Sequence, residues 1–139
     1  MKELSETIAF DIRFSEVDSM NIVWHGSYPL YFEDAREAFG KKYGLGYMMM
    51  FKLGVYAPLV DLRFQYKKAM TYEMKPKIKI TYRPTDTAKI IFDYEIFDSA
   101  DGSIIATGYS VQVFLDHDYN LMLYSPDFYN EWKKIYLEE

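Results

Sequence analysis

The sequence contains no cysteine in its 139 residues and only two histidines. A chain without cysteine forms no disulfide, no thiolate metal site and no cysteine nucleophile, which excludes redox proteins and zinc ribbons. Two histidines are also too few for most metal cages, so we expect no metal site.

Basic residues are not in excess, and no long apolar run is present. The formal net charge is −5 at pH 7, whereas a nucleic-acid-binding surface needs a basic patch or stripe, so we expect no nucleic-acid partner. The N-terminal stretch carries Glu3 and Glu6 and has the pattern of neither a signal peptide nor a membrane span. We therefore expect the protein to stay in the cytoplasm.

Tyrosine and phenylalanine are abundant, with 14 and 10 copies, and such residues favour strands and aromatic-lined surfaces. The length is typical of one domain and no linker or repeat interrupts the chain, so residues 1–139 are expected to form a single domain. Apolar and polar side chains alternate in five segments, which is the pattern of strands with one buried face. The five segments are 8–14, 60–67, 74–82, 90–96 and 105–115. In the last segment the predicted buried side chains are Ile105, Tyr109, Val111, Val113 and Leu115.

A helical period replaces this alternation from Tyr28 onward. Its apolar stripe consists of Tyr28, Tyr31, Phe32, Ala35 and Phe39. Ser27 is suited to be the N-cap of this helix, and Gly44 and Gly46 are suited to end it. A second, C-terminal helix opens at Ser125 and Pro126 and carries Phe128, Trp132 and Ile135. One long helix followed by antiparallel strands predicts an α+β fold in which a sheet wraps around the helix.

The loop 15–27 holds the residues best suited to chemistry. Asp18 stands shortly before the long helix, where its carboxylate could face the unpaired N–H groups of the first turn. A nucleophile or base opposite a hydrogen-bond donor suits the hydrolysis of a thioester. The plain alternative is that Asp18 caps a turn, and Glu16 is expected to be a solvated loop charge. His25 is a general base, a donor to substrate, or only a polar residue at the helix start.

The segment 14–28, and with it nearly the whole chain, resembles the 4-hydroxybenzoyl-CoA thioesterase family, nearest its bacterial Tol-Pal-associated acyl-CoA thioesterase branch. The matching residues are Asp18, Ile22, Val23, Trp24, His25, Tyr28, Tyr31, Phe32, Glu33 and Arg36, with Pro58 and the segment 66–73. The resemblance implies a hotdog fold, with a sheet of about five strands around one long helix, and hydrolysis of an acyl-CoA to free acid and CoA.

The resemblance also implies roles for individual residues. It implies Asp18 and His25 as catalytic residues, with Asp18 as nucleophile or general base and backbone N–H groups at the helix N-terminus polarising the thioester carbonyl. Substrate contacts are implied for Val23, Trp24, Gly26, Tyr28 and Glu33. No cofactor is implied, because CoA is part of the substrate, and the assembly is expected to be a homodimer or homotetramer.

Two other functions stay open: an acyl-acyl-carrier-protein thioesterase, and a non-catalytic acyl-CoA-binding hotdog protein. The sequence departs from the family pattern at Met20 and Asn21, where the family usually has a glycine-rich pair. Asparagine accepts a positive φ more readily than most residues, so Asn21 can preserve the turn.

Three further features each have a functional and a plain interpretation. Glu33 and Arg36 either reach the active site of a neighbouring subunit or form an ion pair on the helix surface. The segment Met48–Phe51, for which no conformation is predicted, either lines an acyl tunnel or fills the core. Basic side chains that either hold CoA phosphates or form a solvated face are Lys67, Lys68, Lys75, Lys77, Lys79 and Arg83.

Overall fold

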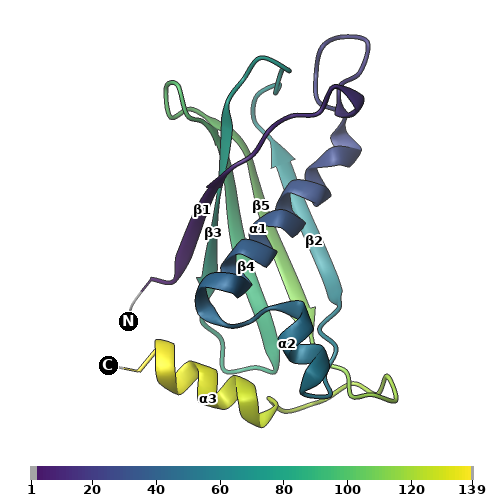
Figure 1. The fold of residues 1–139 in the computed structure, drawn as a ribbon, viewed down its shortest axis with the longest axis vertical. Coiled ribbons are helices and arrows are strands. Elements are labelled where there is room, and N and C mark those ends of the chain that lie inside the picture. Colours follow the sequence, from purple (N-terminus) through teal and green to yellow (C-terminus); the bar gives the residue numbers. More distant parts are fainter. Residues whose placement is uncertain (1–2, 139) are drawn as a thin grey trace.

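The computed structural model describes residues 3–138 and contains a five-stranded antiparallel sheet with one long helix against it (Figure 1). The strands lie in the order β1-β3-β4-β5-β2, so β1 and β2 form the edges of the sheet. Their bounds are β1 Ser5–Ala9, β2 Leu59–Tyr66, β3 Pro76–Arg83, β4 Lys89–Asp98 and β5 Ile104–Val113. All five predicted strands are thus confirmed, although the first is displaced.

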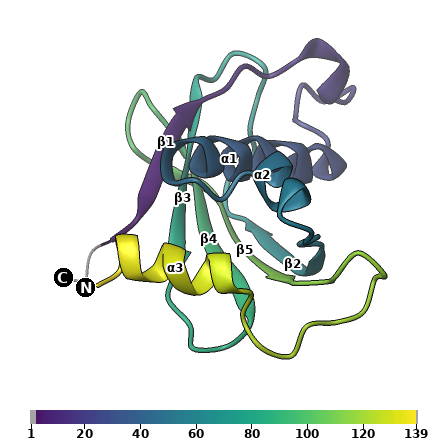
Figure 2. The same cartoon turned by 60° about the horizontal axis from the view of Figure 1, so that its bottom comes forward.

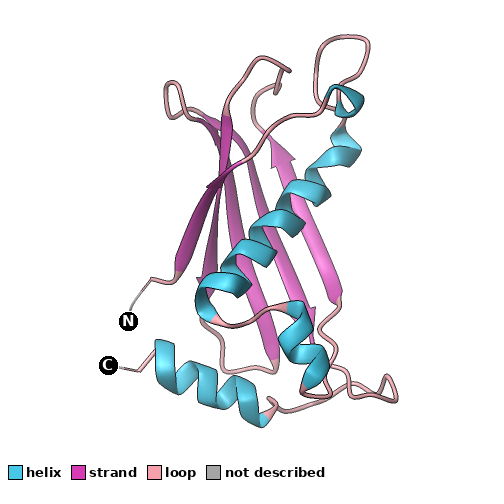
Figure 3. Cartoon of the chain, viewed as in Figure 1, coloured by secondary structure: helices cyan, strands magenta, loops and turns pink. Residues whose placement is uncertain are grey.

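One long helix and two short ones accompany the sheet in the described part of the chain. They are α1 Tyr28–Tyr43, α2 Tyr47–Lys52 and α3 Asp127–Tyr136, with 3₁₀ turns η1 Phe14–Glu16 and η2 His25–Ser27. The helix α1 lies along one face of the sheet and α3 crosses one end of it (Figures 2 and 3). The predicted α+β arrangement is confirmed. No helix within residues 3–138 is long and apolar enough to cross a membrane.

The core forms between α1 and the sheet. The buried residues of α1 are Tyr28, Tyr31, Phe32, Ala35, Phe39 and Gly40. The buried side chains that alternate along β3 and β4 are Ile78, Ile80, Tyr82, Ile90, Phe92, Tyr94 and Ile96. Burying one large apolar side chain contributes about 1.5–3 kcal/mol, so this contact holds α1 firmly and determines where its N-terminus lies.

The first strand differs from the prediction. β1 ends at Ala9, before most of the predicted segment 8–14. The apolar alternation continues past the strand because Phe10 stacks on Tyr31, with ring centroids 4.3 Å apart, and Ile12 is buried as well. An alternation of apolar and polar residues indicates which side chains face the core. It does not show that the backbone pairs with a neighbouring strand.

The predicted inner face of β5 is wrong except at Ile105, which lies at an irregularity in the pairing with β4 and is fully buried. The register pairs Gly108 with Tyr94, so the small residues of β5 face α1. Tyr109 and Val111 lie on the opposite face, although Val111 is buried there. A Cβ on Gly108 would lie 2.8 Å from Cζ of Phe32, so no larger side chain fits at this position.

The ends of α1 agree with the prediction in part. Gly44 ends the helix with a φ of 83°, and its N–H donates to the carbonyl of Gly40 at 2.7 Å. Ser27 precedes the helix but makes no side-chain cap hydrogen bond. Its backbone is already helical because the 3₁₀ turn η2 extends the helix back toward His25.

The helix α3 packs through Tyr129 and Trp132, which are both buried. The hydroxyl oxygens of Tyr129 and Tyr82 are 2.6 Å apart, and Nε1 of Trp132 donates to the carbonyl of Tyr43 at 2.7 Å. Ile135, which the sequence predicts among the apolar residues of this helix, is 69% exposed. Tyr129 and Trp132 occupy the inward side, so Ile135 falls on the solvent side.

The substitution Gly108→Ala tests the packing of α1 on β5. It is expected to lower the free energy of unfolding by about 1–3 kcal/mol, because the added methyl must displace the enclosed ring of Phe32. Chemical denaturation followed by circular dichroism measures the change. Gly46→Ala is the control, since nothing lies within 4 Å of a Cβ added there, and we expect a loss below about 1 kcal/mol. Equal losses in the two variants would contradict the packing argument.

Candidate active site

A pocket of about 380 Å³ opens beside the N-terminus of α1. Its walls come from the loop before α1, from the start of the helix and from the segment after β2. The lining residues are Asp18, Ile22, Val23, His25, Tyr28, Tyr66, Lys67, Lys68 and Ala69. The structure therefore brings Asp18, Val23, His25 and Tyr28, which the sequence singled out, to one pocket.

Asp18 closes a tight turn within this pocket. Its Oδ1 accepts from the N–H of Met20 at 2.8 Å and from the N–H of Ile22 at 3.2 Å. Its carbonyl accepts from the N–H of Asn21 at 3.1 Å. Asn21 takes a φ of 61°, so it preserves the turn at a position where the family usually has a glycine-rich pair. Among residues 3–138 no hydrogen bond engages Oδ2 of Asp18. One carboxylate oxygen thus holds the turn, and the other is available for chemistry.

Backbone donors lie at the start of η2. Within the described residues, the N–H groups of His25 and Gly26 donate to no other group, whereas those of Val23 and Trp24 are bonded to carbonyls. The hydroxyl of Tyr66 donates to the carbonyl of His25 at 3.0 Å, which ties the second wall of the pocket to this turn. Unpaired N–H groups at a helix start attract an oxygen on which negative charge develops.

One side of the pocket is aromatic. The rings of Tyr28 and Tyr66 meet edge to face with centroids 4.9 Å apart, and Tyr28 stacks on Phe64 at 6.2 Å. Burial, with a smaller contribution from Tyr66, raises the pKa of Tyr28 to about 12. Tyr28 is therefore protonated at neutral pH, so it can donate a hydrogen bond but cannot act as a base.

Glu16 is not the solvated loop charge that the sequence suggests. It is half-buried, and its Oε1 accepts from the hydroxyl of Tyr31 at 3.0 Å and from the N–H of Arg13 at 2.8 Å. Burial, together with this hydrogen bond, raises the pKa of Tyr31. Glu16 anchors the loop to α1 and lies outside the pocket lining, which leaves Asp18 as the carboxylate of the pocket.

Trp24 and Gly26 flank the pocket without lining it. The indole of Trp24 is packed over Gly26, where an added Cβ would collide with the ring. Trp24 is still 53% exposed, and it packs beside His25 with ring centroids 5.0 Å apart. Glycine at position 26 is thus explained by the space that the tryptophan ring occupies.

The basic side chains divide into two groups. Lys67 and Lys68 line the pocket, but Lys79 and Arg83 are on β3, where they form ion pairs with Glu3 and Asp93 respectively. The alternative of a solvated face therefore holds for β3. Among residues 3–138 no group of three or more His, Asp and Glu side chains is placed to hold a metal ion.

Sequence reasoning assigned no site role to Tyr66 or Ala69. Tyr66 ends β2 and Ala69 belongs to the segment after it, and only the fold brings these residues to the loop of Asp18. A possible signal was the position of Tyr66, an aromatic residue at a strand end directly before two lysines. A site role for Tyr66 follows only when the end of β2 is known to lie beside the N-terminus of α1.

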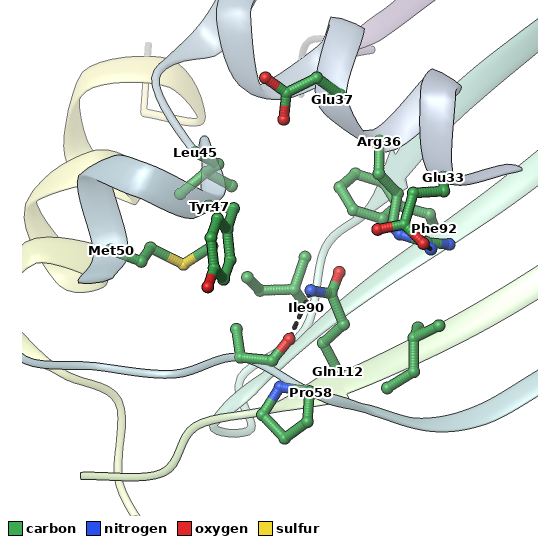
Figure 4. A pocket seen from close by; sticks show the side chains of 12 residues that line it. Glu33, Arg36, Glu37, Leu45, Tyr47, Met50, Pro58, Ile90, Phe92 and Gln112 are labelled. Atoms are coloured by element: carbon green, nitrogen blue, oxygen red, sulfur yellow. Dashed lines mark hydrogen bonds and ion pairs between the residues drawn. The ribbon is translucent and has the colours of Figure 1, made fainter. Parts of the chain in front are cut away.

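Glu33 lies apart from this pocket, at a second cavity of about 300 Å³ between α1, α2 and the sheet (Figure 4). Residues lining it are Glu33, Arg36, Glu37, Leu45, Tyr47, Met50, Ala57, Pro58, Leu59, Ile90, Phe92 and Gln112. The predicted ion pair is present, since Nη2 of Arg36 lies 3.5 Å from Oε2 of Glu33. Nη1 of Arg36 donates to the hydroxyl of Tyr94 at 3.0 Å. The cavity thus combines apolar walls with a largely buried guanidinium.

Relatives of the chain carry thioesterase or esterase names. YneP of Bacillus subtilis (strain 168), provisionally named an acyl-CoA thioesterase, is 32% identical over 90 residues, which are 65% of this chain and 65% of YneP. A provisionally named esterase of Aquifex aeolicus (strain VF5) is 29% identical over 86 residues, which are 62% of this chain and 67% of the relative. The chain therefore spans just under two thirds of the length of YneP.

Solved thioesterase structures superpose on most of the chain. The DHNA-CoA thioesterase from Staphylococcus aureus has a TM-score of 0.80 and 29% identity, covering 97% of this chain and 91% of that chain. A 1,4-dihydroxy-2-naphthoyl-CoA thioesterase from Synechocystis has a TM-score of 0.82 at 14% identity, covering 96% of both chains, which is a likeness of fold alone. The sheet around α1 is thus a hotdog fold. Because the family model described as Thioesterase-like superfamily matches residues 12–132, the chain belongs to that superfamily.

Proposed function

We propose that the protein hydrolyses an acyl-CoA in the pocket at the N-terminus of α1. The observation that carries the proposal is that Asp18 lines one pocket with His25, whose backbone N–H is without a partner among the described residues. The reaction adds water to the thioester, releases a carboxylic acid and the thiol of CoA, and needs no cofactor. Within the superfamily, the segment 14–28 favours the Tol-Pal-associated branch of the 4-hydroxybenzoyl-CoA thioesterases.

The thioester carbonyl lies between Asp18 and the N–H groups of His25 and Gly26 in this proposal. Attack on the carbonyl carbon places negative charge on its oxygen, and loss of one donor to such an oxygen typically costs about 10²–10³ in rate. Asp18 acts either as the nucleophile or as the base that deprotonates water, and both roles use the oxygen that the turn leaves unbonded. The imidazole of His25 orients the substrate.

The substitution Asp18→Asn tests this role. Asparagine keeps a side-chain oxygen that can accept from the N–H groups of Met20 and Ile22, so the turn is retained while the reactive carboxylate is lost. We expect kcat for acyl-CoA hydrolysis to fall by about 10³ or more, with little change in KM. Thiol release from a panel of aliphatic and aromatic acyl-CoAs measures the effect.

A matched control is Asp116→Asn. Oδ1 of Asp116 accepts from the N–H of Asp118 at 2.9 Å and of Asn120 at 3.0 Å, in a turn of the same form outside the pocket. This variant is expected to keep the wild-type rate, and an equally active Asp18→Asn variant would remove Asp18 from its role. Tight CoA binding without hydrolysis would support a non-catalytic acyl-CoA-binding protein. Faster turnover of acyl-carrier-protein thioesters than of acyl-CoAs would support an acyl-acyl-carrier-protein thioesterase.

Lys67 and Lys68 are the proposed partners of the CoA phosphates. Both line the pocket and both are exposed. Nζ of Lys67 donates to Oε1 of Gln65 at 2.9 Å, and Nζ of Lys68 donates to Oγ of Ser103 at 2.9 Å. Gln65 and Ser103 are uncharged, but Nζ of Lys68 also lies 4.0 Å from Oδ2 of Asp101. An exposed ion pair of this kind is weak, so both ammonium groups keep their attraction for phosphate oxygens.

The double variant Lys67→Gln, Lys68→Gln is expected to raise KM for acyl-CoA by about tenfold while kcat stays near the wild-type value. The same acyl group on pantetheine, which lacks the nucleotide phosphates, is the matched substrate. Its KM should be equal for the variant and the wild type. An equal rise for both substrates would show that the lysines do not contact phosphate.

A homodimer through β2 is also part of the proposal. β2 pairs with β5 and is otherwise an edge, along which Leu59, Val60 and Tyr66 are exposed. An open edge is a template for pairing with a second copy. Antiparallel pairing of two β2 strands about a twofold axis sets the Leu59 end of one beside the Tyr66 end of the other. The second cavity, lined by Leu59 and Glu33, would then adjoin the partner's Asp18 pocket and hold the acyl group.

The substitution Val60→Asp is expected to convert the dimer to monomers of 16.5 kDa, because it places a charge at an exposed apolar position that the partner strand would cover. Loss of the dimer should lower kcat/KM for acyl-CoA by about tenfold or more. Light scattering gives the mass, and Ile135→Asp, at an exposed apolar position on α3, is the control. Full activity of a monomeric wild-type protein would contradict this arrangement.

A further inference from the structure

Two segments distant in sequence face each other across the Asp18 pocket. One wall is the loop 18–23, and the other is the segment 66–69. The chain continues from the second wall into residues 70–73, and three contacts join this stretch to the loop. The contacts pair Val23 with Met70, Ile22 with Thr71 and Asn21 with Glu73. The first two contacts use the backbone, and the third uses side chains.

The side-chain contact joins Asn21 to Glu73. Nδ2 of Asn21 donates to both carboxylate oxygens of Glu73, at 3.1 Å and 3.0 Å. A hydrogen bond to an ionised group is stronger than one between neutral groups. The same contact is the largest cause of the lowered pKa of Glu73, which is therefore ionised at neutral pH. We call this pair the Asn21–Glu73 clamp.

The conformation at Asn21 determines how Asp18 is held. The N–H of Asn21 donates to the carbonyl of Asp18 at 3.1 Å, and the next N–H, that of Ile22, donates to Oδ1 of Asp18 at 3.2 Å. The bond from Ile22 depends on the left-handed backbone at position 21, where φ is 61°, because this conformation directs the next N–H back toward Asp18. Residues other than glycine resist this conformation, so a contact that holds the Asn21 side chain favours the turn.

We propose that Asn21 and Glu73 are positioning residues for the Asp18 carboxylate. The inference rests on the proposed function, because the clamp acts through a residue whose role is hydrolysis. Neither clamp residue lines the pocket, so neither contacts the substrate. The clamp holds the loop of Asp18 against the opposite wall, so that the carboxylate meets the thioester in a fixed geometry. Its loss affects kcat, while binding through Tyr28 and Lys67 persists.

The substitution Glu73→Ala is expected to lower kcat by about tenfold and to leave KM within about twofold, because a misplaced reactive group slows chemistry more than binding. Glu73→Gln keeps an oxygen that accepts from Asn21, and its kcat should lie within about threefold of the wild type. Glu131→Ala is the matched control, since Glu131 is an exposed glutamate paired with Lys134 at 3.5 Å on α3, and it should leave kcat unchanged.

A double-mutant comparison separates the clamp from a general structural effect. Glycine at position 21 takes a positive φ without strain but has no side chain to reach Glu73. In an Asn21→Gly background, Glu73→Ala should therefore cause no further loss of kcat. The same loss in both backgrounds would show that Glu73 acts independently of Asn21, and it would overturn the clamp.

Amide hydrogen exchange provides a readout that does not need activity. Glu73→Ala should speed exchange of the Met20 and Ile22 N–H groups by about tenfold, with no change at Ile96 in β4. An unchanged kcat in an active enzyme, or unchanged exchange at these two groups, overturns the clamp and leaves the proposed function standing. Faster exchange in a protein that hydrolyses no acyl-CoA would refute the proposed function and retain the clamp.

Discussion

The close contact between α1 and β5 is the constraint on which the rest of the structure depends. Gly108 has no side chain, so the ring of Phe32 can lie directly against the strand, between Phe64 and Tyr94. Phe32 is fully buried, and interiors at this density leave a helix little freedom to shift. The N-terminus of α1 is therefore positioned by packing further along the helix.

The loop before α1 is held in a different way, by polar contacts at separate points. Glu16 bonds to Tyr31 near one end, and Asp18 holds its own turn through backbone N–H groups in the middle. Within the Asp18 turn, Met20 is exposed and contributes little packing. Hydrogen bonds are directional, so they can place a carboxylate where an apolar contact would only bury it. Packing thus positions the helix, and polar contacts position the Asp18 carboxylate.

Much of the fold could be predicted because its signals are periodic. The stripe of α1 and the alternation along β3 both repeat large apolar residues, and both were confirmed. β5 escaped this reasoning because its inner face is built from small residues such as Gly108 and Ser110, which look neither apolar nor charged in the sequence. Such a face becomes visible only when the bulk of Phe32 is placed opposite it.

The candidate site shows the same limit. Asp18 and His25 were predicted together because both stand in the motif of one loop, whereas Tyr66 comes from a distant strand end. The contact between Glu16 and Tyr31, fifteen positions apart, likewise has no local signal. Chemical residue types can be recognised from a motif, but the opposite wall of a pocket depends on which segments the topology brings together.

The Asp18 pocket and the cavity lined by Glu33 are separate in the chain. They share no lining residue, and the Tyr28–Phe64 and Phe32–Phe64 ring contacts are part of the core beside α1. Opening a route through these rings would break the packing that positions the helix. In the proposed reaction, a thioester at Asp18 extends its acyl group outward, past the β2 edge, where Leu59 and Val60 are exposed. In the proposed dimer, a second β2 edge covers these side chains without disturbing the core of either chain.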